Sequence, residues 1–129
     1  SLMIKVFIVD DSALVRQVLT ACLDRHPGIQ VMGQAADPLF ALEKMQRDWP
    51  DVLVLDVEMP RMDGIELVTL VRRDQRLQSL PVMVVSYKDR EEDRRRGLEA
   101  GADYYLAKAS FHDEALLDAV QTLIGEARE

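Results

Sequence analysis

The sequence predicts an α/β domain in which a doubly wound parallel sheet of five strands carries helices on both faces. Short β-branched apolar runs alternate with segments of helical period along the whole chain. Two of these runs, at 51–55 and 82–85, are apolar on both alternating faces, which is typical of strands covered by helices on each side. The length of 129 residues also suits one domain of ordinary size.

The first half of the chain alternates twice between strand and helix patterns. Residues 4–9 form a β-branched run, and the helix after it begins at Ser12 and stops at the His-Pro-Gly of 26–28. The apolar stripe of this helix is Leu14, Val15, Val18, Leu19, Cys22 and Leu23. A weaker strand is expected at 30–36, and Pro38 suits the first position of a second helix. The apolar side of that helix is Leu39, Ala41, Leu42 and Met45.

The second half of the chain continues the alternation. In order, we expect a strand at 51–55, a loop at 57–63, a helix to about 73, a strand at 82–85, a helix at 89–100, a strand at 104–107 and a helix that opens at Ser110 or Asp113. The segment 89–97 has no large apolar residue. Ion pairs such as Glu91 with Arg95 contribute a few tenths of a kcal/mol, far less than the roughly 1.5–3 kcal/mol of a buried leucine. This fourth helix is therefore expected to be the least firmly docked.

Composition limits the classes of function. Lys and Arg total 16 against 23 for Asp and Glu, a net charge of −7, which argues against direct nucleic-acid binding and favours a cation or a basic partner. The single cysteine, Cys22, excludes an intrachain disulfide and fits a reducing compartment. The chain has no apolar run of about 18 residues and no signal segment. We expect no membrane insertion and a cytoplasmic location.

Polar residues follow four of the expected strands. Asp10 and Asp11 follow the first strand, Asp56 the third, Ser86 the fourth and Lys108 the fifth. The carboxyl ends of parallel strands lie along one edge of a sheet, where ligands bind. Each residue also has an ordinary structural explanation, such as a helix cap or a solvated charge, but none of those explanations requires all of them to meet at one edge.

This group of side chains suits phosphoryl transfer. Two carboxylates about 4 Å apart repel by about 4 kcal/mol at an effective dielectric constant of 20, and Mg²⁺ removes that repulsion. Lys108 supplies a point charge for a phosphoryl oxygen, and Ser86 supplies a hydrogen bond. Carboxylates can themselves be phosphorylated. Asp56 lies centrally among the strands and is the expected acceptor.

Four motifs together resemble the receiver domain of two-component response regulators. They are Val9-Asp10-Asp11-Ser12, the run from Leu55-Asp56 through Glu58 to Asp63-Gly64, Val85-Ser86, and Tyr104-Tyr105-Leu106-Ala107-Lys108. The resemblance covers residues 4–127 as one receiver domain. It implies a flavodoxin-like fold with strand order 2-1-3-4-5.

The resemblance also implies roles for these residues. Asp56 would take a phosphoryl group from the phosphohistidine of a histidine kinase or phosphotransfer domain. Asp10, Asp11, Asp56 and the backbone carbonyl of Glu58 would hold Mg²⁺. Lys108 would pair with the phosphate. Ser86 and Tyr105 would turn toward the site and change the surface of the fourth helix, fifth strand and fifth helix, which a downstream output domain or protein reads.

The two halves of the chain resemble receivers from different subfamilies. Up to Gly64 the chain is similar to receivers of chemotaxis methylesterases, and from Ser86 onward to receivers attached to hybrid chemotaxis kinases.

Two positions depart from the family pattern. Ala109 stands where the family usually has proline, so we expect either a trans Lys108–Ala109 bond with a shifted loop or a strained cis bond. Tyr87 stands where many receivers have a small residue.

These observations favour a signalling domain that is phosphorylated on itself and turns over no external substrate beyond its donor. One alternative is a Mg²⁺-dependent phosphohydrolase of the haloacid dehalogenase kind, in which Glu58 would act as the second acid. Such enzymes use a cap domain, for which this chain has no room. Another alternative is a degenerate receiver that serves only as a docking module, which the presence of both Asp56 and Lys108 disfavours.

Overall fold

The computed structural model describes residues 3–59 and 62–128 and confirms a five-stranded parallel sheet in the order β2-β1-β3-β4-β5. The strands are β1 (Ile4–Val9), β2 (Ile29–Ala35), β3 (Val52–Leu55), β4 (Val82–Ser86) and β5 (Tyr104–Ala107). The helices are α1 (Ala13–Asp24), α2 (Pro38–Arg47), α3 (Gly64–Arg73), α4 (Glu91–Ala100) and α5 (Asp113–Arg128), with a short 3₁₀ turn, η1 (Lys108–Ser110). Within these described ranges, no helix is both long enough and apolar enough to cross a bilayer.

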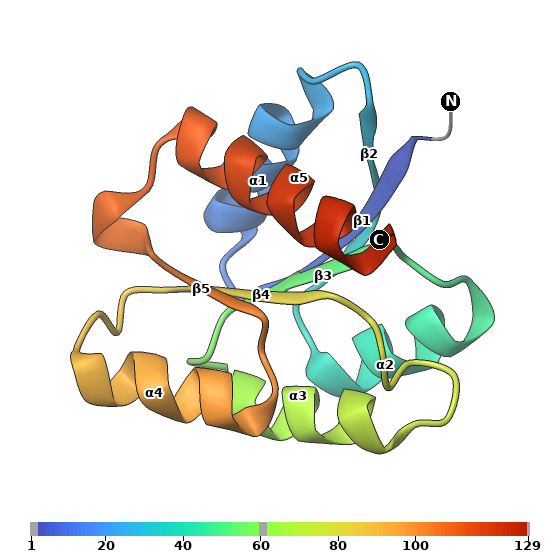
Figure 1. Ribbon diagram of the computed structural model, residues 1–129, viewed down its shortest axis with the longest axis vertical. Coiled ribbons are helices and arrows are strands. Elements are labelled where there is room, and N and C mark those ends of the chain that lie inside the picture. Colours follow the sequence, from blue (N-terminus) through green and yellow to red (C-terminus); the bar gives the residue numbers. More distant parts are fainter. Residues whose placement is uncertain (1–2, 60–61, 129) are drawn as a thin grey trace.

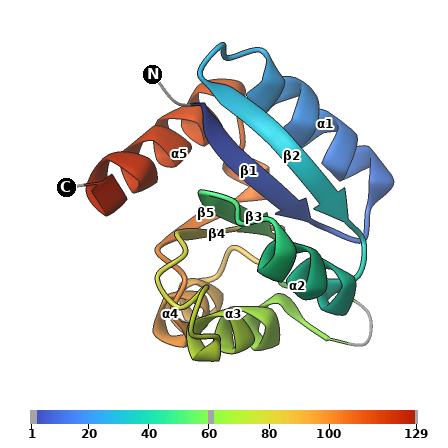
Figure 2. The same cartoon turned by 90° about the vertical axis from the view of Figure 1, so that its right-hand side faces the viewer.

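The sheet separates two hydrophobic cores. Helices α1 and α5 cover one face, and α2, α3 and α4 cover the other (Figures 1 and 2). Successive residues of β3 face opposite cores: Leu53 and Leu55 pack with α2 and α3, whereas Val52 and Val54 pack with α1 and α5. The central strands therefore need apolar residues at every position, which explains their continuous hydrophobic runs.

Strand β2 is irregular because of a bulge. Val6 of β1 pairs with Val31, but the next residue, Phe7, pairs with Gly33, so β2 has one extra residue. A Cβ atom on Gly33 would lie 2.8 Å from the Phe7 ring. Gly33, which interrupts the apolar pattern of this strand, therefore provides the space for a core phenylalanine.

The apolar stripe of α1 is wider than the face that the helix buries. Ser12 caps the helix by accepting a hydrogen bond from the backbone N–H of Val15, and Leu19, Cys22 and Leu23 are buried. Leu14 and Val18, however, are 68% and 48% exposed. Expecting them on the buried side of an amphipathic helix was wrong, because periodicity alone cannot show how much of a helix its neighbours cover. The same correction applies to Leu39 of α2, which is 53% exposed.

Few residues of helix α4 are buried. It begins at Glu91 rather than Asp89, and Gly97 is its one buried residue among those the structure describes. A Cβ atom at Gly97 would lie 2.9 Å from the Tyr105 ring, so this glycine gives β5 room to place a tyrosine against the helix. The small buried face agrees with the expectation of weak docking.

Side chains from other elements hold the two ends of α4. Before the helix, the Tyr105 hydroxyl donates a 2.6 Å hydrogen bond to the carbonyl of Lys88. After it, the Arg72 guanidinium donates from Nη2 to the carbonyl of Gly101 at 2.7 Å and from Nη1 to that of Leu80, also at 2.7 Å. Gly101 ends the helix with a φ of 118°, a conformation that favours glycine.

The Arg72→Ala substitution is expected to lower the free energy of unfolding by about 2 kcal/mol, because it leaves carbonyl groups without the charged donor that they have now. Hydrogen exchange should rise most at the carboxyl end of α4. The control is Arg73→Ala, which removes an exposed charge from the neighbouring position. Equal effects of the two substitutions in urea unfolding would contradict this role for Arg72.

Candidate functional site

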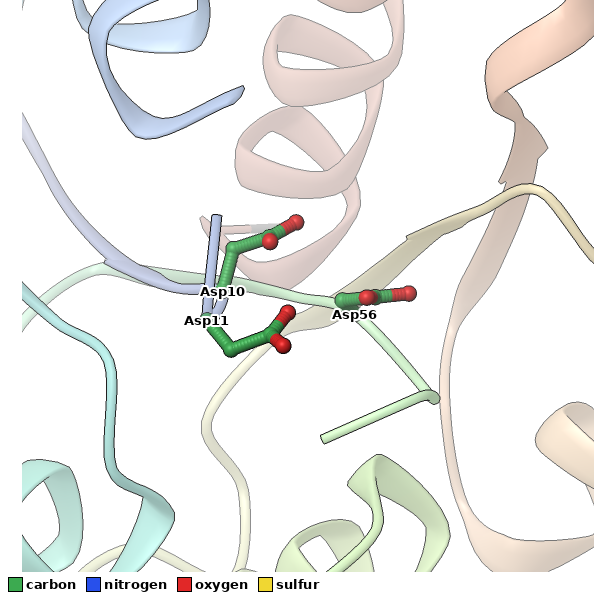
Figure 3. A group of neighbouring side chains, drawn as sticks. All are labelled: Asp10, Asp11 and Asp56. Atoms are coloured by element: carbon green, nitrogen blue, oxygen red, sulfur yellow. The ribbon is translucent and has the colours of Figure 1, made fainter. Parts of the chain in front are cut away.

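Three carboxylates meet at the carboxyl edge of the sheet. Asp10 and Asp11 follow β1 and Asp56 follows β3, the neighbouring strand (Figure 3). Carboxylate oxygens of the three residues all lie within 4.8 Å of one another. Asp10 and Asp56 are buried and Asp11 is exposed. The expected convergence of these residues is therefore observed, and the cluster can hold a metal ion.

Short-range hydrogen bonds fix the position of Asp10. Its Oδ1 accepts a 2.9 Å hydrogen bond from the backbone N–H of Ser12, and its backbone carbonyl accepts a 2.6 Å bond from Nη1 of Arg16. Arg16 also donates to the side chain of Gln34 on β2. Arg16 was not expected beside these carboxylates, because the position of one arginine on a helix does not indicate its hydrogen-bond partner.

Lys108, the residue directly after β5, completes the cluster. Its side chain is 8% exposed, and its Nζ lies 3.0 Å from Oδ2 of Asp10 and 3.6 Å from Oδ2 of Asp56. The described residues contain no cis peptide bond, so the Lys108–Ala109 bond is trans. Of the two expected geometries the trans form is the one present, and it leaves Lys108 in contact with both acids.

The surroundings of Asp56 disfavour its charged form. Burial raises the pKa of the Asp56 carboxyl above its ordinary value, the Lys108 ammonium lowers it, and the Asp10 carboxylate raises it again. Carboxylate oxygens are the ligands that Mg²⁺ and other hard divalent cations prefer. Three carboxylates against one ammonium leave the site with a net negative charge, and this donor set therefore fits such a cation.

The raised pKa of Asp56 leads to a prediction about stability. In the metal-free protein, the free energy of unfolding should fall as the pH rises from the ordinary carboxyl pKa through the raised folded-state pKa, because the folded state then holds a disfavoured charge. Asp56→Asn removes this dependence and should be more stable than the native sequence at neutral pH, with the difference vanishing in acid.

The measurement is urea unfolding from pH 4 to pH 8 in chelator and then in excess Mg²⁺. Mg²⁺ at 100 times its Kd should stabilise the native sequence by about 2.7 kcal/mol, and Asp56→Asn should lose much of this gain. A variant that is less stable than the native sequence at neutral pH without metal would refute the argument.

Ser86 and Tyr105 both bind the backbone of one residue in the β4–α4 loop. The fully buried Ser86 Oγ accepts a 3.1 Å hydrogen bond from the N–H of Lys88, whose carbonyl accepts from the Tyr105 hydroxyl. The Tyr105 ring is buried, and this burial raises the pKa of its phenol. The two expected switch residues are thus linked through Lys88.

The carboxylates and Lys108 line an open cleft of about 310 Å³, together with Ser12, Leu14, Val15, Glu58 and Tyr87. Beside it lies a more apolar pocket of about 160 Å³, which shares Leu14, Val15, Tyr87 and Lys108 with the cleft. Glu58 is exposed, and Pro60 and Arg61 of the same loop lie outside the described residues. The sequence pattern did not predict that Leu14 lines the rim of the cleft, because a leucine in the apolar stripe of a helix is expected in the core.

Comparison with known proteins agrees with this geometry. Residues 6–121 match the family model of the response regulator receiver domain. A protein-glutamate methylesterase/protein-glutamine glutaminase from Chromobacterium violaceum is 42% identical over 129 residues, which is 98% of this chain and 35% of that protein. One from Xanthomonas campestris is 45% identical over 128 residues, 98% of this chain and 33% of that protein. The chain thus spans about a third of the length of these relatives.

Solved structures show the same fold. The response regulator domain of Thermotoga maritima CheB aligns with a TM-score of 0.86 and 31% identity, covering 95% of this chain and 97% of that one. The chemotaxis response regulator CheY4 of Vibrio cholerae aligns with a TM-score of 0.84 and 36% identity, covering 94% and 98%. The likeness to methylesterases extends over both halves of the chain. The chain belongs to the family of response regulator receiver domains, and its relatives include chemotaxis regulators.

Proposed function

We propose that residues 4–127 act as a phosphoacceptor receiver in which Asp56 takes a phosphoryl group from the phosphohistidine of a histidine kinase or phosphotransfer domain. The observation that carries this proposal is the approach of Lys108 Nζ to both Asp10 and Asp56, at 3.0 and 3.6 Å, beside a cluster of three carboxylates. An acceptor carboxylate, a cation and a candidate divalent-metal site are the groups that phosphoryl transfer needs.

The residues divide the work of transfer among them. An ionised Asp56 oxygen attacks phosphorus, the bond between phosphorus and the donor imidazole nitrogen breaks, and its electron pair stays with the imidazole. Asp10, Asp11, Asp56 and the backbone carbonyl of Glu58 would hold Mg²⁺, which neutralises phosphoryl charge when it is bound. Lys108 would move from Asp10 to a phosphoryl oxygen as a compact point charge.

The connection between Ser86, Lys88 and Tyr105 supports a route from the site to α4. If the Ser86 hydroxyl turned to donate to a phosphoryl oxygen, its Oγ would release the N–H of Lys88. The same residue is held through its carbonyl by Tyr105, so the loop before α4 would change its contacts. We propose that a downstream output domain or protein reads this change on α4, β5 and α5.

The exposed leucine at the rim of the cleft offers a contact surface for the donor. Leu14 is 68% exposed and lines both the cleft and the neighbouring apolar pocket. A donor protein that places its phosphohistidine in the cleft would cover this side chain. Its burial is the kind of apolar contact that anchors protein partners.

The test is labelling of the protein by acetyl phosphate with Mg²⁺, followed by intact-mass spectrometry. We expect a gain of one phosphoryl group in the native sequence, no gain in Asp56→Ala and no gain in chelator. A kinase that carries phosphohistidine should then transfer its label to the native sequence alone. No labelling with either donor would contradict the proposal and would favour a docking module.

The phosphohydrolase alternative is not favoured. The family model covers 6–121 as a receiver domain, and Glu58, which would have to act as a second acid, is exposed. A hydrolase would turn over many phosphoester molecules for each protein. The labelling experiment separates the two functions when p-nitrophenyl phosphate is supplied in excess, because a receiver releases no more than a trace of p-nitrophenol.

A further inference from the structure

Tyr87 occupies a position between two hollows of the surface. It follows Ser86 directly, its side chain is 68% exposed, and it lines both the acidic cleft and the apolar pocket beside it. Its ring centre lies 4.7 Å from Nζ of Lys108. An ammonium at this distance over an aromatic face is attracted by the ring's electron density.

The Lys108 ammonium therefore lies near two carboxylates and one aromatic ring. Asp10 and Asp56 attract it by their charge, and the ring of Tyr87 attracts it by a charge distribution that does not depend on ionisation. A cation held by the two carboxylates, or a phosphoryl group on one of them, changes their attraction for the ammonium. The attraction between the ammonium and the Tyr87 ring stays in place. The four-carbon stem of lysine is flexible, so an ammonium that loses its ion pairs has many alternative positions.

We propose that Tyr87 is a positioning residue that keeps the Lys108 ammonium over the cleft when its ion pair with Asp10 is given up. The ammonium then has a short path to a phosphoryl oxygen on Asp56. This inference rests on the proposed function for its phosphoryl step, but the contact between ring and ammonium is independent of it.

Tyr87 could also act only by packing against its neighbours. Variants that keep or remove the aromatic ring and the hydroxyl separate this packing role from the positioning role. Tyr87→Leu keeps an apolar side chain but removes the aromatic face. Tyr87→Phe keeps the face and removes the hydroxyl. Phe40→Leu is a matched control, because Phe40 of α2 forms the same type of contact with Lys44, at 5.3 Å and away from the cleft.

The first measurement uses proton NMR without any phosphoryl donor. The ε-methylene protons of Lys108 should be shifted upfield by the ring in the native sequence and in Tyr87→Phe, and should return to the ordinary lysine range in Tyr87→Leu. The shift should persist when Mg²⁺ and beryllofluoride, a phosphoryl mimic, are added. Loss of the shift on this addition would overturn the proposal.

The second measurement is the rate of labelling by acetyl phosphate as a function of its concentration. Tyr87→Leu should lower the limiting rate by about 3- to 10-fold, the size of one cation–π contact, with a smaller change in half-saturation. Tyr87→Phe should restore the native rate, and Phe40→Leu should equal it. A native rate in Tyr87→Leu, or equal losses in the leucine and phenylalanine variants, would overturn the proposal. Absence of labelling in the native sequence would refute the proposed function, and the NMR shifts would then decide the role of Tyr87 alone.

Discussion

Replacing Lys108 with methionine is expected to slow phosphoryl labelling of Asp56 by about 10²–10³-fold, the usual effect of removing one charged or hydrogen-bonding group that stabilises a transition state. The reason is geometric, since the ammonium is nearly buried and lies 3.6 Å from Asp56, the proposed acceptor carboxylate. Methionine has a similar length and suits an apolar environment, so the variant tests the charge more than the packing.

The control for this prediction is Lys44→Met, which removes the same charge from α2, outside the cleft. This variant should be labelled at the native rate. The comparison separates the local role of Lys108 from the effect of the domain's net charge. Circular dichroism should show that both variants fold. Rates within threefold of each other in the two variants would remove Lys108 from the mechanism.

The Gly64→Ala substitution is expected to lower the free energy of unfolding by about 3 kcal/mol, at the upper end of the effects of overpacking. Gly64 is the buried first residue of α3. A Cβ atom there would overlap the Asp56 carbonyl oxygen and a Leu55 methyl group, and would lie 2.9 Å from Cα of Val57. Two of these three atoms belong to the backbone and cannot move aside as a side chain does, so α3 must shift away from β3.

Urea unfolding of Gly64→Ala and of Gly28→Ala checks this argument. At Gly28 the nearest atoms belong to the His26 side chain, at 3.3 Å and beyond, and that ring can move. The Gly28 variant should stay within about 1 kcal/mol of the native sequence. If both variants show losses of that small size, the packing of α3 against residues 55–57 is looser than the structure indicates. An insoluble Gly64 variant would agree in direction with the expected loss.

The alternation of periods in the sequence was sufficient to place every strand to within a residue or two. Strand ends are where the sequence is most informative about the site. A parallel sheet brings these ends to one edge, so Asp10, Asp56 and Lys108 could be placed together although 98 positions separate the first from the last. The nearest partner of Lys108 could not be predicted, because its Nζ lies 3.0 Å from Asp10 and 3.6 Å from Asp56, a small difference that no sequence pattern encodes.

Other features depend on surroundings that a linear pattern does not contain. Leu14 and Val18 continue a stripe in which Leu19, Cys22 and Leu23 are buried, yet both are exposed among the described residues. A leucine that packs in the core has the same periodicity as one that contacts a partner. Arg72 is one arginine near a helix end, as the sequence showed, but its carbonyl partners come from two loops brought together only by folding.

The two ends of helix α4 are held to the rest of the domain in different ways. The loop before it is held to β5 by the Tyr105 hydroxyl, whereas its carboxyl end is held by two bonds from the Arg72 guanidinium to the carbonyl of Gly101. A displaced Tyr105 would therefore free the first turn while the last turn stays at its hinge on Arg72. Such a motion would be largest at the end of α4 that lies toward the carboxylate cluster, and a partner that binds the first turn of α4 would respond to it most strongly.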